Sequence, residues 1–406
     1  MKNKINITIT ALFLVLIFGF GIAFWVLPDT DFSPEENRPL QTFPELSADE
    51  WLEGKVSSRL IDYYSDQFPL RSAWVSLHAF GELGLGRGES SGVLLGENGQ
   101  LAVRRFDAYV SLTERLKGTD YYDPAHVQRG LEAVVALDKT LAAQNIPLCV
   151  LLAPRTIDVT IGDYSYPADL TDRLDETIRT ALGDAQVNSV ELLDTFRSMH
   201  DAGEYVYFRT DHHWTAKGAY TAYAAVMESW DMAEEVLPED FFTVRSVPDF
   251  YGTTYSRGGM YFTSPDTLEI WEAADGSDSR FSVLEPGKTG TDDPNVVIES
   301  GFISESYLEG KDKYGAFLDG THRILFITDK EAAARGESRP RLLLARDSFA
   351  NSMVPFLARH FDICMVNLSG GMTNLSELAA AYGCERVLIV CNRENLVTAD
   401  CLNNLK

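Results

Sequence analysis

RLLLARDSF, residues 341–349, is an apolar strand-like run that ends in a charged pair, Arg346-Asp347, and a serine, Ser348. An apolar run without polar alternation is typical of a strand that is buried on both faces of a parallel sheet. In open sheets of this kind, ligands bind beyond the carboxyl ends of the strands. Ser348 is therefore predicted to lie at the edge of the sheet where a substrate would bind.

Similar apolar runs and helical segments alternate on both sides of this strand. The expected strands are 146–153, 187–193, 341–345, 363–368 and 386–391, and the expected helices are 130–145, 170–182, 216–230, 349–361 and 377–382. This alternation predicts an α/β domain over residues 129–406, built on a buried parallel sheet. Residues 231–338 interrupt the rhythm and are interpreted as an insertion packed beside the sheet, near the site. Residues 28–128 are interpreted as a linker and lead-in, with helical periodicity around 51–68 and a hairpin at 93–101 that turns at Asn98-Gly99.

The N-terminal segment, residues 1–27, predicts where the chain resides. Ile5–Leu27 is almost uncharged and would be about 34 Å long as a helix, enough to cross a bilayer core of about 30 Å. Lys2 and Lys4 precede it and acidic residues follow it, which places residues 28–406 outside the cytoplasm, anchored by one helix. The alternative is a cleaved signal peptide with a processing site at 21–23, which would secrete the same residues.

The exported part is strongly acidic. The chain has a net charge of −25, and residues 1–27 contribute only Lys2 and Lys4, so the remainder carries −27. Such a charge repels polyanions over a Debye length of about 8 Å, which argues against nucleic acid as a partner. A neutral or amino-sugar glycan is easier to bind than a uronic-acid polymer, although acidity that only aids solubility explains the charge equally well. The five cysteines show no CxxC or zinc spacing, and no cofactor is expected.

A second cluster, TDHHWT at residues 210–215, lies just ahead of the helix that is expected from Ala216. Two-residue spacing suits Asp211 and His213 on an extended turn that Thr215 would end as the N-cap of the helix. One His213 nitrogen would then reach Ser348 while Asp211 orients the other, which is how a serine hydroxyl is made nucleophilic. His212 is the alternative base, with a different partner geometry.

Other roles compete with this triad. A serine between a strand and a helix is often an N-cap, which is the plainest interpretation of Ser348 taken alone. Asp211, His212 and His213 would suit zinc, but no further cluster has ligand spacing, so no metal site is predicted. Asp347 would suit a carboxylate pair for glycoside hydrolysis, but it fits better as an acceptor of backbone amides in the turn.

With these residues in place, the chain resembles the bacterial DHHW family, which is related to the alginate O-acetyltransferases of the SGNH-hydrolase-like superfamily. The resemblance rests on Asp211-His212-His213-Trp214 and on other segments in a shared order, at 36–40, 66–71, 96–101, 250–256 and 346–352. It implies an SGNH-hydrolase-like three-layer α/β/α fold with a parallel central sheet, and a catalytic triad of Asp211, His213 and Ser348. Residues expected to bind substrate or shape the site are His212, Trp214, Arg346, Asn351 and Tyr255.

The resemblance also implies an activity and its partners. The chain would be an O-acetyltransferase acting on a cell-surface glycan, supplied with acetyl groups by a multipass membrane O-acyltransferase. Arg346 stands where SGNH hydrolases usually carry glycine, and the usual glycine and asparagine oxyanion blocks are not identifiable. Two alternatives therefore stay open: a carbohydrate O-acetylesterase, and a non-catalytic glycan-binding or assembly protein.

Overall fold

The computed structural model describes residues 2–44, 51, 53, 55–104, 124–164, 169–286, 295–370, 374–403 and 405 of the 406-residue chain. It forms two compact units, residues 1–91 with 255–263 and residues 92–254 with 264–406. The domain boundaries expected after residues 27 and 128 stay predictions.

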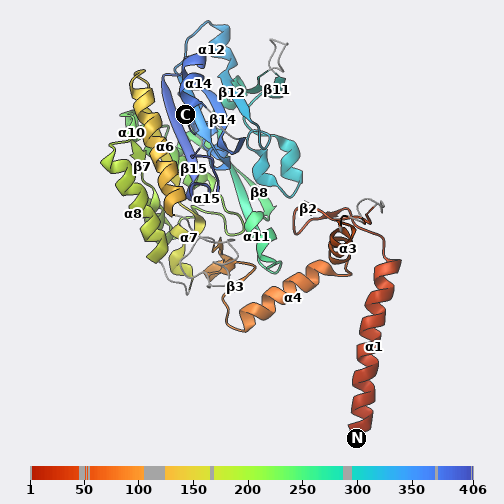
Figure 1. The fold of residues 1–406 in the computed structure, drawn as a ribbon. Coiled ribbons are helices and arrows are strands. Elements are labelled where there is room, and N and C mark those ends of the chain that lie inside the picture. The colour runs from red at the N-terminus through yellow and green to blue at the C-terminus, as the bar shows by residue number, and fades with distance from the viewer. Residues whose placement is uncertain are drawn as a thin grey trace. The chain divides into compact units, whose positions relative to one another are not determined.

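The first unit is mostly helical (Figure 1). Its elements are α1 (Lys2–Val26), β1 (Phe32–Ser33), β2 (Arg38–Pro39), α3 (Lys55–Asp66), α4 (Arg71–Gly84) and β3 (Glu89–Ser90). α1 contains Lys4–Val26, a segment of 23 residues with a mean hydropathy of 2.6, which is long and apolar enough to cross a membrane. The sequence predicted α3 but not α4. Pro69 separates the two helices because the residue before a proline is disfavoured in helical conformation.

The second unit is built on an eight-stranded sheet with the order β11-β10-β12-β14-β13-β15-β6-β7. Its strands are β6 (Leu148–Ala153), β7 (Ser189–Val190), β10 (Phe281–Glu285), β11 (Asn295–Ile298), β12 (Ile324–Asp329), β13 (Arg341–Arg346), β14 (Asp362–Asn367) and β15 (Arg386–Asn392). The strands from β14 to β7 are parallel, which confirms the expected parallel centre. β10, β11 and β12 add antiparallel pairs, so the insertion at 231–338 extends the sheet as well as packing beside it.

Helices cover both faces of this sheet and complete the three layers (Figure 1). They are α6 (Pro124–Ala142), α7 (Thr156–Val159), α8 (Asp169–Asp184), α9 (Leu193–Asp201), α10 (Ala216–Ser229), α12 (Lys330–Ala334), α13 (Val354–Leu357), α14 (Leu375–Tyr382) and α15 (Arg393–Thr398). Leu342 and Leu344 of β13 join the core with α9, α10 and α13. Leu343 and Ala345 join the opposite core with α6, α8, α14 and α15. A strand that fills two cores needs apolar residues at successive positions, which explains its unalternated sequence.

Two hairpins flank the sheet. β4 (Val93–Leu95) and β5 (Leu101–Val103) pair antiparallel, and Asn98 and Gly99 turn the chain with φ of 54° and 78°, as the sequence predicted. β8 (Phe242–Phe250) pairs antiparallel with β9 (Asp266–Ala273). The chain between them begins with α11 (Thr253–Gly258), so this segment is partly helical.

Ser348 lies where the chain order of the sheet reverses. From β13 the chain continues to β14 on one side, and β15 then returns to the other side. Such a reversal opens a crevice at the carboxyl ends of the strands. The 3-10 turn η8 (Ser348–Ser352) begins there, and its N-cap is Asp347 rather than Ser348. The single helix expected over 349–361 is wrong: η8 ends, and α13 begins anew with Pro355 in its first turn, where a missing N–H is tolerated.

Alanine substitutions at two helical glycines are expected to have opposite effects on stability. A Cβ on Gly218 of α10 would lie 2.6 Å from Val206 O and 2.9 Å from Trp214 Cβ, so Gly218→Ala should lower the free energy of unfolding by about 1–3 kcal/mol. A Cβ on Gly183 of α8 meets nothing within 4 Å, so Gly183→Ala should raise it by up to about 1 kcal/mol. Urea unfolding of the detergent-solubilised chain measures both. A stabilised Gly218→Ala chain would show that helix propensity outweighs the contact.

Candidate active site

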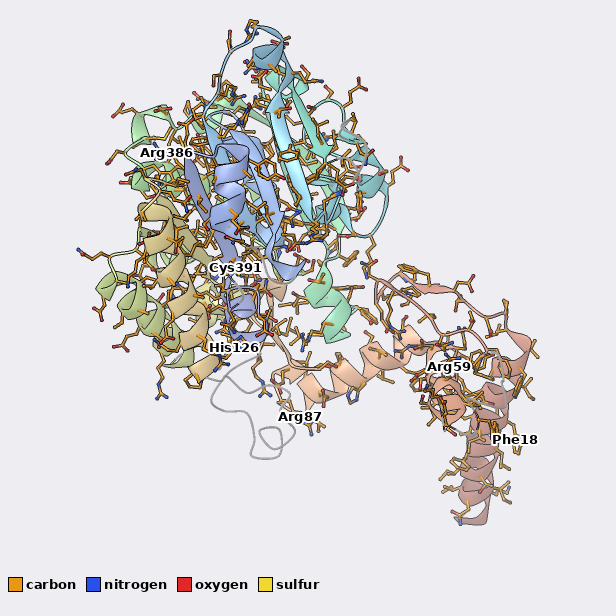
Figure 2. The ribbon with its side chains drawn as sticks, turned by 45° about the horizontal axis from the view of Figure 1, so that its top comes forward. Phe18, Arg59, Arg87, His126, Arg386 and Cys391 are labelled. Carbon is orange, nitrogen blue, oxygen red and sulfur yellow. The ribbon has the colours of Figure 1, made fainter. Side chains whose placement is uncertain are left out.

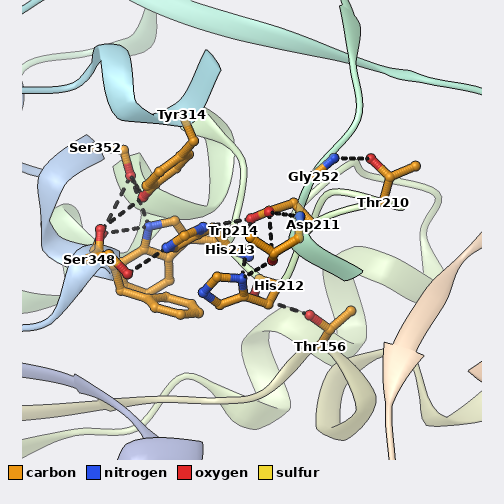
Figure 3. Close-up of polar contacts among 12 residues, drawn as sticks. Thr156, Thr210, Asp211, His212, His213, Trp214, Gly252, Tyr314, Ser348 and Ser352 are labelled. Atoms are coloured by element: carbon orange, nitrogen blue, oxygen red, sulfur yellow. Dashed lines mark hydrogen bonds and ion pairs between the residues drawn. The ribbon is translucent and has the colours of Figure 1, made fainter. Parts of the chain in front are cut away.

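Asp211, His213 and Ser348 form a continuous hydrogen-bonded chain (Figure 3). His213 Nδ1 lies 2.6 Å from Asp211 Oδ1, and His213 Nε2 lies 2.7 Å from Ser348 Oγ. Because Nδ1–H donates a hydrogen bond to the carboxylate, Nε2 is the nitrogen that accepts the hydrogen bond from the serine hydroxyl. Asp211 and His213 are buried, whereas Ser348 is half-buried. Of these three residues, Ser348 is therefore the most accessible to a substrate.

Trp214 joins the turn that carries the acid and the base to the turn that carries the serine. Its backbone forms an isolated bridge with Tyr207, and its ring N–H donates to Phe349 O at 3.1 Å and to Ser352 Oγ at 3.0 Å. Directly after it, Thr215 caps α10 as the sequence predicted. Trp214 is fully buried, and its bonds hold the two turns together.

Thr253 completes the surroundings of Asp211. Its N–H and its hydroxyl donate to Asp211 Oδ2 at 2.8 and 3.0 Å. The Thr253 hydroxyl has one proton, which it uses in the hydrogen bond to Asp211. Thr253 Oγ1 therefore accepts the hydrogen bond from His212 Nδ1, which lies 2.6 Å away. His212 therefore stands beside His213, with ring centroids 3.8 Å apart, and has no direct bond to the serine. The sequence did not reveal this role of Thr253.

Burial keeps the base neutral. It is the largest cause that lowers the pKa of His213 to about 4; His212 lowers this pKa further, and Asp211 acts in the opposite direction. Burial alone would raise the pKa of Asp211, but the two imidazoles and the hydrogen bonds from His213 and Thr253 hold that pKa well below its usual range. At neutral pH the pair is an uncharged imidazole beside a carboxylate, the state that general-base catalysis requires.

Tyr314 fixes the plane of the His213 ring. The two rings stack with centroids 3.8 Å apart and an interplanar angle of 9°. The phenol donates to Ser348 O at 3.1 Å, and its oxygen lies 3.1 Å from Ser352 Oγ. Burial raises the pKa of Tyr314 well above its usual value, so the phenol stays neutral. Tyr314 comes from the insertion at 231–338, where no sequence pattern set it apart from other tyrosines.

Asp347 holds the serine turn against the neighbouring strand. It accepts the Phe349 N–H at 3.0 Å, the Asn392 N–H at 2.6 Å and the Asn395 side-chain amide at 2.8 Å. This confirms that Asp347 serves backbone amides rather than a carboxylate pair. The Ser348 N–H is the first of the η8 turn, an end at which donors point away from the turn.

Arg346 and Asn351 lie under the serine turn and face one loop. Arg346 Nη2 is 3.4 Å from His322 O, and Asn351 Nδ2 is 3.3 Å from Gly320 O. Both side chains are buried, and burial lowers the pKa of Arg346 to about 10. The arginine that stands in place of the usual glycine thus bonds the loop at residues 320–322. Direct contact of either residue with substrate stays a prediction.

Asp266 is a supporting residue that the sequence did not reveal. Its buried carboxylate accepts the N–H and the hydroxyl of Thr210 at 2.7 and 2.6 Å, and it also accepts the Tyr205 hydroxyl. These bonds anchor the chain just ahead of Asp211. Tyr255, in contrast, belongs to the first unit and is buried there, so its expected contact with substrate stays a prediction.

A metal site would use the same residues. Asp211, His212 and His213 place possible ligand atoms within 4.8 Å of one another. However, Asp211 and His213 already bond each other, and the second nitrogen of His213 faces Ser348. A bound cation would have to break both contacts, so the geometry favours the triad over zinc.

Comparison with known proteins shows what this chain is similar to. Residues 113–249 match the family described as the SGNH hydrolase-like domain of acetyltransferase AlgX. The probable alginate O-acetylase AlgJ of Azotobacter vinelandii is 26% identical over 203 residues, which are 49% of this chain and 46% of that protein. Over these segments the chain is similar to SGNH-hydrolase-like acetyltransferases. The matched part spans about half the length of these curated relatives.

Two solved structures share the fold of this chain. A DHHW family protein from Eubacterium siraeum DSM 15702 is similar with a TM-score of 0.56 at 15% identity, covering 78% of this chain and 95% of that one. Bacillus cereus PatB1 with a sulfonyl adduct is similar with a TM-score of 0.58 at 17% identity, covering 77% and 97%. The expected fold and the resemblance to the DHHW proteins are confirmed.

The pKa of His213 predicts the pH dependence of the site. Only the neutral imidazole accepts the serine proton, so the rate of Ser348 acylation should stay constant from about pH 8 to pH 6 and fall as pH drops through about 4. Stopped-flow acylation by an activated acetyl ester measures this profile. His212→Ala should move the midpoint upward, because His212 lowers this pKa. A midpoint at about 6.5, the value of a solvent-exposed histidine, would contradict the burial argument.

Gly252 leaves room for Asp211. A Cβ at this position would lie 2.2 Å from Asp211 Cβ and 2.4 Å from its Oδ2, so Gly252→Ala must displace the carboxylate. We expect acylation to slow by about 10²- to 10⁴-fold, the range for a misplaced or missing orienting carboxylate. Gly162→Ala, whose Cβ meets nothing within 4 Å, is the matched control. Unchanged acylation in a folded Gly252→Ala chain would contradict the role of Asp211 in orienting His213.

Proposed function

We propose that this protein is an extracytoplasmic O-acetyltransferase that transfers acetyl groups to a cell-surface polysaccharide. The observation that carries the proposal is the unbroken chain from Asp211 through His213 to Ser348, at a strand end where the sheet order reverses. The kinship with probable alginate O-acetylases supports acetyl as the group transferred. α1 would hold the enzyme at the outer face of the membrane; if the segment were cleaved, the enzyme would be secreted.

The reaction would proceed through an acetyl-serine. Ser348 Oγ attacks the carbonyl carbon of an acetyl ester while His213 Nε2 takes its proton. The ester C–O bond then breaks, and the departing oxygen receives that proton from His213. A sugar hydroxyl next gives its proton to His213 and attacks the acetyl-serine, and Ser348 leaves with the proton restored. Asp211 keeps the imidazole oriented and offsets its transient positive charge.

The charge of the chain bears on the acceptor, and its expected place at the membrane bears on the donor. Residues 28–406 carry −27, so a neutral or amino-sugar glycan would be favoured over a polyanion such as a uronic-acid polymer. The donor would be supplied at the membrane by a multipass O-acyltransferase. The preference for a neutral glycan is the main point on which this protein would differ from its relatives named for alginate.

Two other functions use the same fold. A carbohydrate O-acetylesterase would resolve the acetyl-serine with water, and the half-buried position of Ser348 is compatible with that. A non-catalytic glycan-binding or assembly protein is suggested by the glycine-to-arginine change at Arg346. The buried Arg346 donates to the His322 carbonyl, which does not itself disable the triad.

Intact mass measurement after brief exposure to an activated acetyl ester tests the proposal. The wild-type chain should gain one acetyl group, and Ser348→Ala should lower the rate of modification by at least about 10³-fold because the nucleophile is lost. Ser352→Ala, in the same turn, is the control that keeps the nucleophile. Faster loss of the adduct with a neutral sugar indicates transfer, and loss to water alone indicates an esterase. A folded wild-type chain without any adduct would leave only the binding or assembly function.

A further inference from the structure

α3 and α4 each expose a row of apolar side chains, which the connection between them continues. Ile61 and Tyr64 of α3, like Trp74 and Leu77 of α4, are three positions apart on one side of their helix, and Phe68 and Leu70 lie in the connection. Exposed fractions range from 39% for Trp74 to 70% for Leu70, and soluble monomers rarely expose such continuous apolar surface. We call this surface the apolar face of α3 and α4; it comprises Ile61, Tyr64, Phe68, Leu70, Trp74 and Leu77.

The apolar face continues into α1. Phe20 lies 5.6 Å, ring to ring, from Phe68 and 5.5 Å from Trp74, and Phe24 lies 5.1 Å from Tyr64. These contacts line a groove of about 670 Å³ between α1 and the two helices. Phe18, labelled on α1 in Figure 2, is 64% exposed, and none of the apolar window of α1 is buried by protein. One uninterrupted apolar surface therefore runs from the candidate membrane span onto α3 and α4.

These contacts fix the depth of α3 and α4 relative to the membrane span. α1 ends at Val26, so Phe20 lies about 9 Å inside the apolar helix. Side chains that pack on Phe20 therefore lie within the depth of about 5–10 Å that interfacial helices reach, just beneath the level where lipid headgroups meet acyl chains. Tryptophan and tyrosine gather at that level because their rings are apolar and their polar atoms reach water. Tyr64 and Trp74 supply these two residue types.

Polar contacts on the other side of α3 fix its orientation, so that its apolar row stays exposed. Gln67 bonds Thr30 in both directions, at 2.9 and 3.0 Å, and the Tyr63 hydroxyl donates to Asp29 at 3.1 Å. Asp66 accepts from Arg38 at 2.5 Å. The partners Asp29 and Thr30 directly follow the end of α1. α3 is thereby tied to the exit point of the membrane helix, with its apolar row on the outside.

We propose that the apolar face of α3 and α4 lies in the outer surface layer of a phospholipid bilayer beside α1. The first unit would then be an embedded platform and not only a single-helix anchor. The exported residues carry −27, so attraction to anionic headgroups does not supply the binding, which depends on apolar insertion. The inference rests on α1 crossing the membrane and is independent of the chemistry at Ser348.

A fluorescent label on the full-length chain in phosphatidylcholine vesicles tests the inference. Leu77→Cys and Ile61→Cys place an NBD label on the apolar face of each helix; all five native cysteines are buried, and the wild type treated with the same reagent measures their background. Thr180→Cys on the exposed polar side of α8 is the aqueous reference. Both face labels should lose most of their fluorescence to phosphatidylcholine spin-labelled near the headgroup and resist iodide in water. The Thr180 label should behave in the reverse way.

The result should not change in about 1 M salt, where the Debye length is about 3 Å. Face labels that iodide quenches as it does the Thr180 label would overturn the proposal. Labels shielded from iodide but not quenched by the spin-labelled lipid would show that protein covers the face, which also overturns it. If the shielding disappears when the chain is diluted in lipid, that covering protein is a second copy of this chain. Acetyl-serine formation, measured in the same vesicles, reports separately on the proposed function.

Discussion

The buried charge of Asp211 is the constraint on which the site depends. A carboxylate removed from water costs several kcal/mol unless hydrogen-bond donors replace its hydration. His213 and Thr253 each supply two donors, one from the backbone and one from the side chain. Thr253 is 42 positions away, so the carboxylate is satisfied only when the chain after β8 packs onto the DHHW turn. Gly252 permits that approach because a side chain there would occupy the place of Asp211.

The nucleophile is held by a separate set of bonds that starts in the sheet. Asp347 ties the turn after β13 to Asn392 at the end of β15 and to Asn395 in α15, on the side of one core. Trp214 reaches the same turn from the opposite core and bonds Phe349 O. The acid and base therefore approach a serine whose turn is fixed from both faces of the sheet. This explains how residues 135 positions apart reach hydrogen-bond distance without either one lying on a long, unsupported loop.

The sequence predicted the parallel strands and the turns that carry Asp211, His213 and Ser348 because both depend on local pattern. Continuous apolar runs specify strands buried on two faces, and the two-residue spacing before the Thr215 cap specifies an extended turn. Thr253, Tyr314 and Asp266 were not predictable in this way. They act through contacts between the insertion and the site, and these contacts follow from tertiary packing, which leaves no periodic signal. The helix expected over 349–361 failed because apolar periodicity continues through Pro355, whereas backbone hydrogen bonding does not.

The exposure of the site limits how an enzyme of the proposed kind could choose transfer over hydrolysis. Ser348 and His212 are only half-buried, as a serine must be if a polymer is to reach it along the chain's surface. An open serine is also open to water, so exclusion of water cannot provide the whole preference. The acceptor must instead gain its advantage by binding with one hydroxyl already aligned on His213. Membrane attachment would also favour the first step, acetylation of Ser348. An acetyl group delivered through the membrane would meet a tethered serine at a high effective concentration.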